Sequence, residues 1–146
     1  ILVRLHKGGK GCISVSQIAT GEENDLSCKI YASEGGISWA QEHPNYLWIH
    51  KYGEPKKLYS RNADYLTEAA TEVCRTPSGH PEGYLEAFAN IYVDAAEAIR
   101  RYINGNPMKT EEYKFPTVYD GLRGMQFIYK AIESSQKGSI WMKMPG

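Results

Sequence analysis

The chain has 146 residues, of which 42% are hydrophobic and 23% charged, and its 17 basic residues balance 17 acidic ones. These values are ordinary for one soluble globular domain. A balanced charge gives no reason to expect a nucleic-acid or anionic-membrane partner. The longest apolar runs are a few residues, far short of the roughly 20 that cross a bilayer. We therefore expect a cytoplasmic protein with no nucleic-acid and no membrane partner.

The chain starts at Ile1, inside a segment that already alternates like a β-strand. No basic-then-apolar leader precedes it. We expect residues 1–146 to form a single α/β domain that is truncated at its amino terminus and belongs to a longer protein.

The first half predicts strands separated by turns. The expected strands are residues 1–6, 12–19, 26–33, 36–41, 46–52 and 57–60, and glycine, proline and asparagine lie between most of them. An antiparallel meander is the simplest arrangement of such strands.

Alternation along these strands predicts a two-faced sheet. Cys28 and Ile30 should point to one face, whereas Lys29 and Tyr31 should point to the other. We expect helices to cover one face and the other to stay open, where it can meet solvent or a second subunit.

The second half predicts helices. Asp64 is a candidate cap for a short helix that continues to residue 74. Pro81 suits the first position of a longer helix, whose apolar residues recur at spacings of three and four until Gly105.

A third helix should begin at Thr117, which forms a capping-box pattern with Asp120, and should end at Gly138. Residues 139–144 alternate again and predict a last strand. The predicted fold class is α+β, with an open-faced, mostly antiparallel mixed sheet and helices packed on one face.

The cysteines and the glycine-rich segment near the amino end could in principle form functional sites, but both favour a structural role. The three cysteines, Cys12, Cys28 and Cys74, show neither a CxxC pattern nor metal-ligand spacing, so we expect reduced core thiols and no metal site. The glycines at 8, 9 and 11 lead into a predicted strand, whereas a dinucleotide-binding loop opens a helix. They predict a hairpin turn.

The segment GHPEGY contains the candidate substrate-binding residues His80, Glu82 and Tyr84. A histidine at the start of a helix can donate to or accept from a sugar hydroxyl, although it can also merely cap the helix. Glu82 is favoured by the helix dipole with or without a ligand. Tyr84 begins the apolar stripe and fits a core position equally well.

Three segments resemble the carboxy-terminal domain of the Gfo/Idh/MocA oxidoreductases: residues 77–92 with GHPEGY, residues 115–125 with DGLRGM, and residues 134–138. The likeness extends from residues 16–21 through 30–36 to the last predicted strand. The resemblance implies a fold of the dihydrodipicolinate-reductase-like or GAPDH-like carboxy-terminal type. It also implies an amino-terminal Rossmann domain, absent from this chain, that binds NAD or NADP.

The resemblance further implies a sugar, polyol or related hydroxy compound as substrate, bound between the two domains, and a homo-oligomer formed through the open sheet face. The Lys, Asp and His that assist catalysis in this family have no counterpart in these residues, so no catalytic residue is expected here and the chain alone should be inactive. Two other readings remain open: a free-standing small-ligand-binding module and a non-catalytic dimerisation domain.

Overall fold

The computed structural model describes residues 1–145, which divide into two compact units. The first unit comprises residues 1–19 and the chain from Thr110 onward, and the second comprises Thr20–Lys109. The first unit contains the strands β1 (Leu2–Arg4) and β2 (Lys10–Cys12), a 3-10 turn at Thr110–Glu112 and the helix α3 (Val118–Gln136). The second contains β3 (Ser27–Tyr31), β4 (Gly35–Ala40), β5 (Tyr46–Lys51), β6 (Lys57–Ser60), α1 (Glu68–Glu72) and α2 (Tyr84–Ile103).

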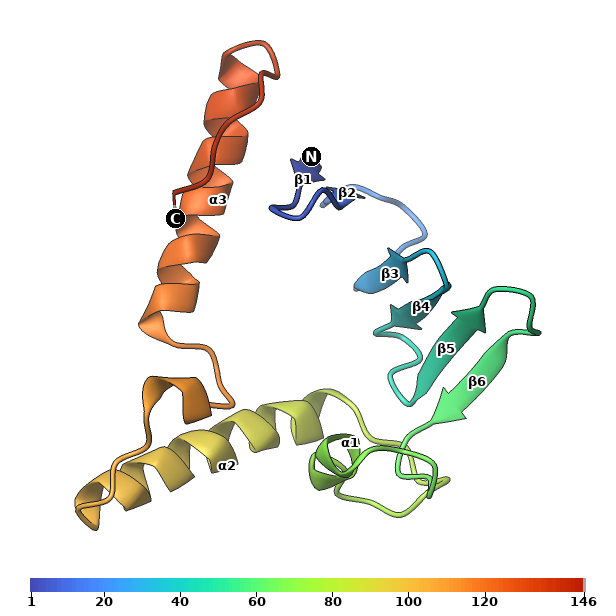
Figure 1. The fold of residues 1–146 in the computed structure, drawn as a ribbon, viewed down its shortest axis with the longest axis vertical. Helices are drawn as coiled ribbons and strands as arrows, with labels where there is room; N and C mark the ends of the chain where they lie inside the picture. The colour runs from blue at the N-terminus through green and yellow to red at the C-terminus, as the bar shows by residue number, and fades with distance from the viewer. Residues whose placement is uncertain (146) are drawn as a thin grey trace. The chain divides into compact units, whose positions relative to one another are not determined.

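The sheet of the second unit is the predicted meander. Its strand order is β3-β4-β5-β6, and each neighbouring pair is antiparallel (Figure 1). The expectation of a mixed sheet is wrong for the described residues. Each connection is a short turn, and such a turn can join only antiparallel neighbours.

The register of the strands gives the sheet two distinct faces. Ile37 pairs with both Ile30 and Ile49, and paired residues point to the same side. We call this side the apolar face; it carries Cys28, Ile30, Ile37, Trp39, Leu47, Ile49 and Tyr59, together with Lys51 and Lys57. The opposite side, the mixed face, carries Lys29, Tyr31, Ser38, Trp48, His50 and Leu58. The predicted alternation of β3 is therefore confirmed.

The helices of the second unit differ from the prediction at their starts. The short helix begins after Thr67, whose backbone is extended, and Asp64 does not cap it. The long helix begins at Tyr84 rather than at Pro81, and Gly83 is its N-cap. Neither helix packs on the sheet within the described residues. The layer of helices expected on one sheet face is thus not formed inside this unit.

The last turns of both long helices end as predicted. Gly105 and Gly138 have φ values of +73° and +81°, the left-handed region in which glycine carries no steric penalty. At the end of α3, Ser139 N–H donates to Ser134 O at 2.7 Å and Gly138 N–H to Ser135 O at 3.2 Å. This pattern is a Schellman motif.

Other parts of the first unit correct the prediction. Residues 13–19 form no strand, and the Ser16 hydroxyl accepts a bond from Ile18 N–H at 3.2 Å, a local turn that competes with strand pairing. The last strand at 139–144 is also not formed. The Ser134 hydroxyl donates to Ile140 O at 2.6 Å, which ties that segment to α3.

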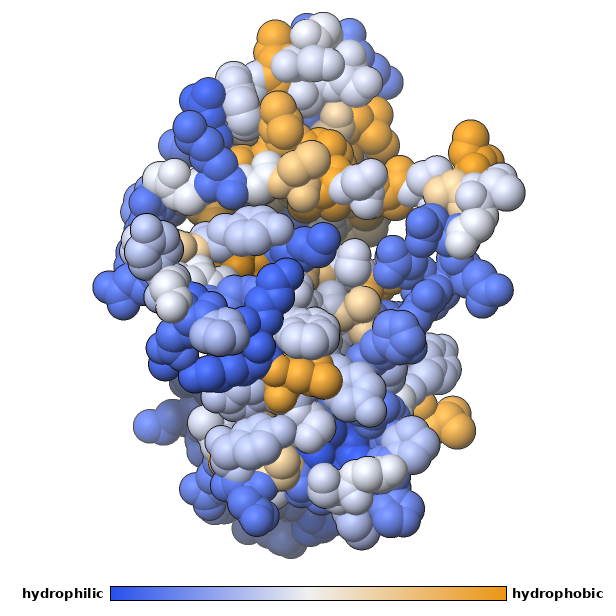
Figure 2. Space-filling model, turned by 90° about the vertical axis from the view of Figure 1, so that its right-hand side faces the viewer, coloured by the Kyte–Doolittle hydropathy of each residue, from blue (hydrophilic) through white to orange (hydrophobic). Residues whose placement is uncertain are grey.

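Neither unit buries its apolar side chains. Among the described residues no hydrophobic side chain is buried, and Figure 2 shows hydrophobic side chains at the surface on the face that it presents. Cys12 and Cys28 are exposed, so the prediction of core cysteines is wrong for these two; all three thiols are free. No helix within residues 1–145 is long and apolar enough to cross a membrane.

Candidate functional site

The carboxylate of Glu82 forms the centre of the loop between α1 and α2. Glu82 is 9% exposed, the one buried polar or charged residue among those described. Its Oε1 accepts hydrogen bonds from the backbone N–H groups of Arg75 and Thr76. Its Oε2 lies 3.2 Å from Nη1 of Arg61. These bonds hold Glu82 outside the helix, which explains why α2 starts two residues later than this position.

Arg61 follows β6 directly, and both terminal nitrogens of its guanidinium group bond to this loop. Nη1 donates to Thr76 O at 2.9 Å, and Nη2 donates to Thr76 Oγ1 at 3.0 Å, to Pro77 O at 3.3 Å and to His80 O. Its side chain is only 14% exposed. A planar guanidinium has five donors in fixed directions, whereas an ammonium has only three, so arginine suits a site with this many acceptors.

Asn45, in the turn before β5, completes the arrangement. Its Oδ1 accepts from Arg61 Nε at 3.0 Å and from the backbone N–H of Glu82 at 2.9 Å. Asn62, with a φ of 52°, adds a bond from Nδ2 to Thr76 O at 2.8 Å. The ends of two strands therefore fix the loop that precedes α2.

His80 lies in a tight turn of this loop and is exposed. Its N–H donates to Pro77 O at 3.1 Å, and the Thr76 hydroxyl donates to its carbonyl at 3.0 Å. Gly79, with a φ of +83°, makes the turn possible. Because α2 starts at Tyr84, His80 does not lie at the mouth of the helix as expected. The turn rather than the helix presents the imidazole.

Tyr84 lies on the surface and not in a core. It is 71% exposed, and its ring lies 4.8 Å from that of Phe88, centroid to centroid. At the same helix start, Glu86 Oε2 accepts from Gly83 N–H at 2.9 Å. This bond to the backbone lowers the pKa of Glu86 below its usual value. Of the three candidates, His80 and Tyr84 have side chains open to a ligand, whereas the Glu82 carboxylate is fully engaged.

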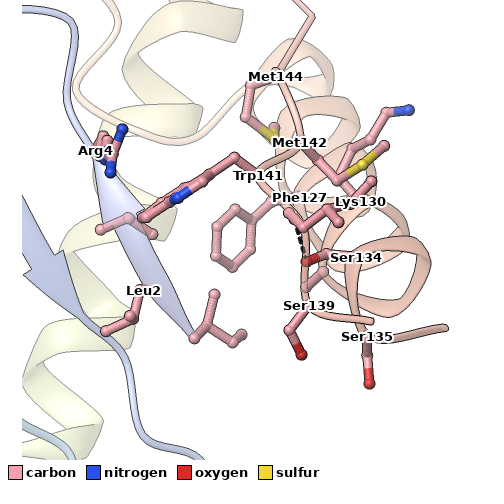
Figure 3. Close-up of a pocket in the computed structure, with 14 residues that line it drawn as sticks. Leu2, Arg4, Phe127, Lys130, Ser134, Ser135, Ser139, Trp141, Met142 and Met144 are labelled. Carbon is pink, nitrogen blue, oxygen red and sulfur yellow. Dashed lines mark hydrogen bonds between the residues drawn. The ribbon is translucent and has the colours of Figure 1, made fainter. Parts of the chain in front are cut away.

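A separate cavity of about 650 Å³ lies within the first unit (Figure 3). Residues of β1, of α3 and of the segment after α3 line it. Arg4 lies 4.0 Å from the centre of the Trp141 ring, a cation–π contact. The lining includes Leu2, Phe127, Met142 and Met144. None of the three candidate site residues lines this cavity.

A hollow of about 490 Å³ lies on the mixed face of the sheet. Gly36 has no side chain to fill it, and a Cβ there would come within 2.5 Å of Ile30 O. Ser38 Oγ and His50 Nε2 are 3.2 Å apart at its edge. No acidic residue lines the hollow, so these two do not form a catalytic triad there.

The glycine-rich segment near the amino end does not form a dinucleotide-binding loop. The glycines at 8, 9 and 11 belong to the hairpin between β1 and β2, with Gly8 N–H bonded to Leu5 O at 3.0 Å, and no helix follows them. The hairpin prediction is therefore confirmed. Within residues 1–145 no group of three His, Cys, Asp or Glu side chains is placed to hold a metal ion.

Sequence reasoning missed Arg61 altogether and recognised Asn45 only as a turn residue. An arginine after a predicted strand looks like a solvated surface residue, and nothing in the local pattern links it to a loop fifteen and more positions later. The one available signal was Glu82, because a carboxylate in a turn rich in glycine and proline needs a partner when it is buried.

Comparison with known proteins places the chain beside oxidoreductases. No family model matches the chain. It is 28% identical over 143 residues to the uncharacterized oxidoreductase YfiI of Bacillus subtilis, covering 98% of this chain and 36% of that protein. The α+β fold with antiparallel sheets and three helices matches a part of dehydrogenase structures.

Two solved structures show this likeness more specifically. An inositol dehydrogenase homolog from Azotobacter vinelandii, solved with NADH and myo-inositol, has a TM-score of 0.92 and 26% identity, over 97% of this chain and 38% of that one. An oxidoreductase from Sinorhizobium meliloti has a TM-score of 0.78 and 45% identity, over 88% of this chain and 35% of that one. The chain thus spans little more than a third of the length of these proteins.

Proposed function

We propose that the chain is the carboxy-terminal substrate-binding and oligomerisation domain of an NAD(P)-dependent dehydrogenase of the Gfo/Idh/MocA family. Its substrate is a sugar, a polyol or a related hydroxy compound. The nicotinamide cofactor is bound by a Rossmann domain outside these residues, so the chain by itself carries no redox step. The observation that carries the proposal is the similarity over 97% of the chain to part of an inositol dehydrogenase homolog solved with NADH and myo-inositol.

The open apolar surfaces support membership in a larger protein. Ile30 is 53% exposed and Ile37 is 38% exposed on the apolar face of the sheet. Water is a poor environment for a continuous aliphatic surface, so a helix layer, another domain or another subunit has to cover it. The mixed face, with Tyr31 and Trp48, is the surface we assign to the homo-oligomer, because aromatic residues are enriched in subunit interfaces.

Within the proposed domain, His80 is the residue that contacts substrate. The imidazole can exchange hydrogen bonds with a hydroxyl as either donor or acceptor. Tyr84, whose side chain is 71% exposed four residues later, adds an apolar ring beside the sugar carbons. Glu82 belongs to the same segment and supports it through Arg61.

The test is a turnover assay of the full-length protein that carries this chain. Purified enzyme is mixed with NAD or NADP and with a panel of polyols and sugars, myo-inositol first, and formation of reduced nicotinamide is followed. We expect turnover of at least one cyclic polyol or sugar by the full-length protein and none by residues 1–146 alone. A full-length protein that oxidises no member of the panel and binds no nicotinamide cofactor contradicts the proposal.

A further inference from the structure

We propose that Arg61 and Glu82 are positioning residues for His80: together they fix the main chain of residues 75–80, so that the imidazole is presented to substrate from a fixed position. The inference rests on the proposed function, in which His80 contacts that substrate. Neither residue would touch the substrate itself. Their effect would pass through the backbone carbonyl of His80 and the turn that precedes it.

The main chain of His80 is restrained by hydrogen bonds to its carbonyl group. Nη2 of Arg61 donates to the His80 carbonyl, which also accepts from Thr76 Oγ1 at 3.0 Å. Pro81 follows directly and disfavours the helical region for the residue before it. The peptide unit between His80 and Pro81 is therefore restrained from both sides. The point from which the imidazole projects is thereby fixed, while the ring can still turn about its own side-chain bonds to meet a substrate.

The opposite charges of Arg61 and Glu82 neutralise each other in a largely buried position. Arg61 is 14% exposed and Glu82 side-chain atoms are 6% exposed, so each charge has lost most of its water. A buried charge persists when a partner and hydrogen bonds replace that water. Nη1 of Arg61 meets Oε2 of Glu82 at 3.2 Å, while Oε1 accepts from the backbone N–H groups of Arg75 and Thr76. The pair therefore fixes both ends of the turn.

The imidazole ring of His80 is available to a ligand. No hydrogen bond joins the His80 ring to another side chain or backbone group within residues 1–145, and the residue is exposed. All the described bonds of His80 are made by its main chain. A histidine with an anchored backbone and an unengaged ring is suited to receive a hydroxyl group from outside.

The experiment compares Arg61→Met, Arg61→Lys, Glu82→Gln, His80→Ala and the double variant Arg61→Met/His80→Ala in the full-length protein. The probe is the polyol or sugar with the highest turnover in the panel above, and the readouts are KM, kcat and the NMR signals of the His80 ring without substrate. Circular dichroism checks that each variant folds. Arg61→Lys retains the positive charge beside Glu82 but lacks the planar guanidinium group. If Arg61→Met does not fold, Arg61→Lys tests the positioning role instead.

We expect Arg61→Met to raise KM about 10- to 100-fold, the range that a misplacement near 1 Å produces, and Arg61→Lys to raise it less. The ring signals of His80 should also shift, because the turn that carries the ring becomes mobile. The double variant should bind the probe as poorly as His80→Ala alone, because Arg61 acts through His80.

The outcomes separate this inference from the proposed function. If His80→Ala raises KM but Arg61→Met and Arg61→Lys do not, or if the two effects simply add, the positioning role is overturned and the proposed function stands. If His80→Ala leaves KM unchanged, or if no member of the panel is turned over, the substrate contact of His80 fails and the positioning role fails with it.

Discussion

Arg61 and Glu82 form an ion pair of 3.2 Å between the end of a strand and the residue that precedes a helix cap. Both side chains are largely withdrawn from solvent, and Asn45 Oδ1 accepts one hydrogen bond from the Arg61 side chain and one from the backbone N–H of Glu82. The sheet and the loop before α2 are therefore joined by polar bonds and not by apolar packing. Polar bonds of this kind depend strictly on geometry, and they make the loop sensitive to single substitutions.

Glu82→Gln should destabilise the full-length protein by about 3–5 kcal/mol, because it leaves the Arg61 guanidinium without its countercharge in a dry site. Urea unfolding of the full-length protein measures the change. The backbone N–H groups of Arg75 and Thr76 should also exchange with solvent faster, since they lose a charged acceptor.

Two controls accompany this variant. Glu54→Gln breaks the surface pair with Lys57, whose side chains are 50% and 42% exposed, and should leave the unfolding midpoint nearly unchanged. Arg61→Met/Glu82→Leu removes both charges and should recover part of the loss. A double variant that is less stable than Glu82→Gln would show that the pair itself does not account for the effect.

Gly79→Ala should cost about 1–2 kcal/mol, because φ is +83° and the left-handed region is unfavourable for a residue with a Cβ. No atom lies within 4 Å of the added methyl group, so the cost is conformational and not steric crowding. Thermal or urea unfolding measures it.

Gly121→Ala is the matched control, since its position in α3 is equally open. There alanine should stabilise the helix by up to about 1 kcal/mol. Opposite signs for the two substitutions are expected; a destabilising Gly121→Ala of similar size would contradict the conformational explanation.

The carboxylate of Glu133 should titrate far below an ordinary glutamate. Lys130 and Lys137 each hydrogen-bond to it at 2.7 Å, and these bonds lower its pKa from 4.5 to about 2. A lowered folded-state pKa means that the stabilisation is present above pH 4.5 and is lost as the pH falls toward 2. A carboxyl NMR titration of the full-length protein reads this directly.

Lys137→Met should raise the pKa of Glu133, because one of the two bonds to the ionised form is lost. Lys143→Met, in the segment after α3, serves as the control and should leave the titration unchanged. An unshifted titration midpoint in Lys137→Met would rule out this source of the low pKa.

Trp48→Glu should weaken self-association of the full-length protein, if the mixed face of the sheet is the oligomer surface proposed above. Trp48 is 42% exposed and lies opposite Ser38, near the middle of that face. A charge there would have to be desolvated on association. Trp48→Phe retains an aromatic contact and should still associate. Light scattering over a range of concentrations distinguishes the two, and equal masses would contradict the assignment.

Local chemistry made much of the fold predictable. Gly105 and Gly138 end their helices, and Asp120 reaches back to Thr117 N–H and Oγ1 at 2.8 Å, as the capping pattern indicated. The hydrogen bonds to Thr117 lower the pKa of Asp120. The sheet meander followed from turn residues and alternation in the same way, because both signals act between near neighbours.

Residues joined across long stretches of sequence were not predictable. The start of α2 depends on Arg61 and Asn45, which hold Glu82 outside the helix, and a periodicity of three and four residues contains no information about them. The missing strands at 13–19 and 139–144 have a similar cause. Their alternation is suited to a sheet, but a strand forms only where a neighbouring strand accepts its hydrogen bonds.

Asn45 has a consequence for how this protein tolerates change. Its single side-chain oxygen serves both Arg61 and the backbone of Glu82, so the short connection ahead of β5 is part of the machinery that shapes the histidine turn. An inserted or deleted residue in that connection would displace the shared acceptor. Such a change would displace the imidazole of His80, which lies far along the sequence from the altered turn.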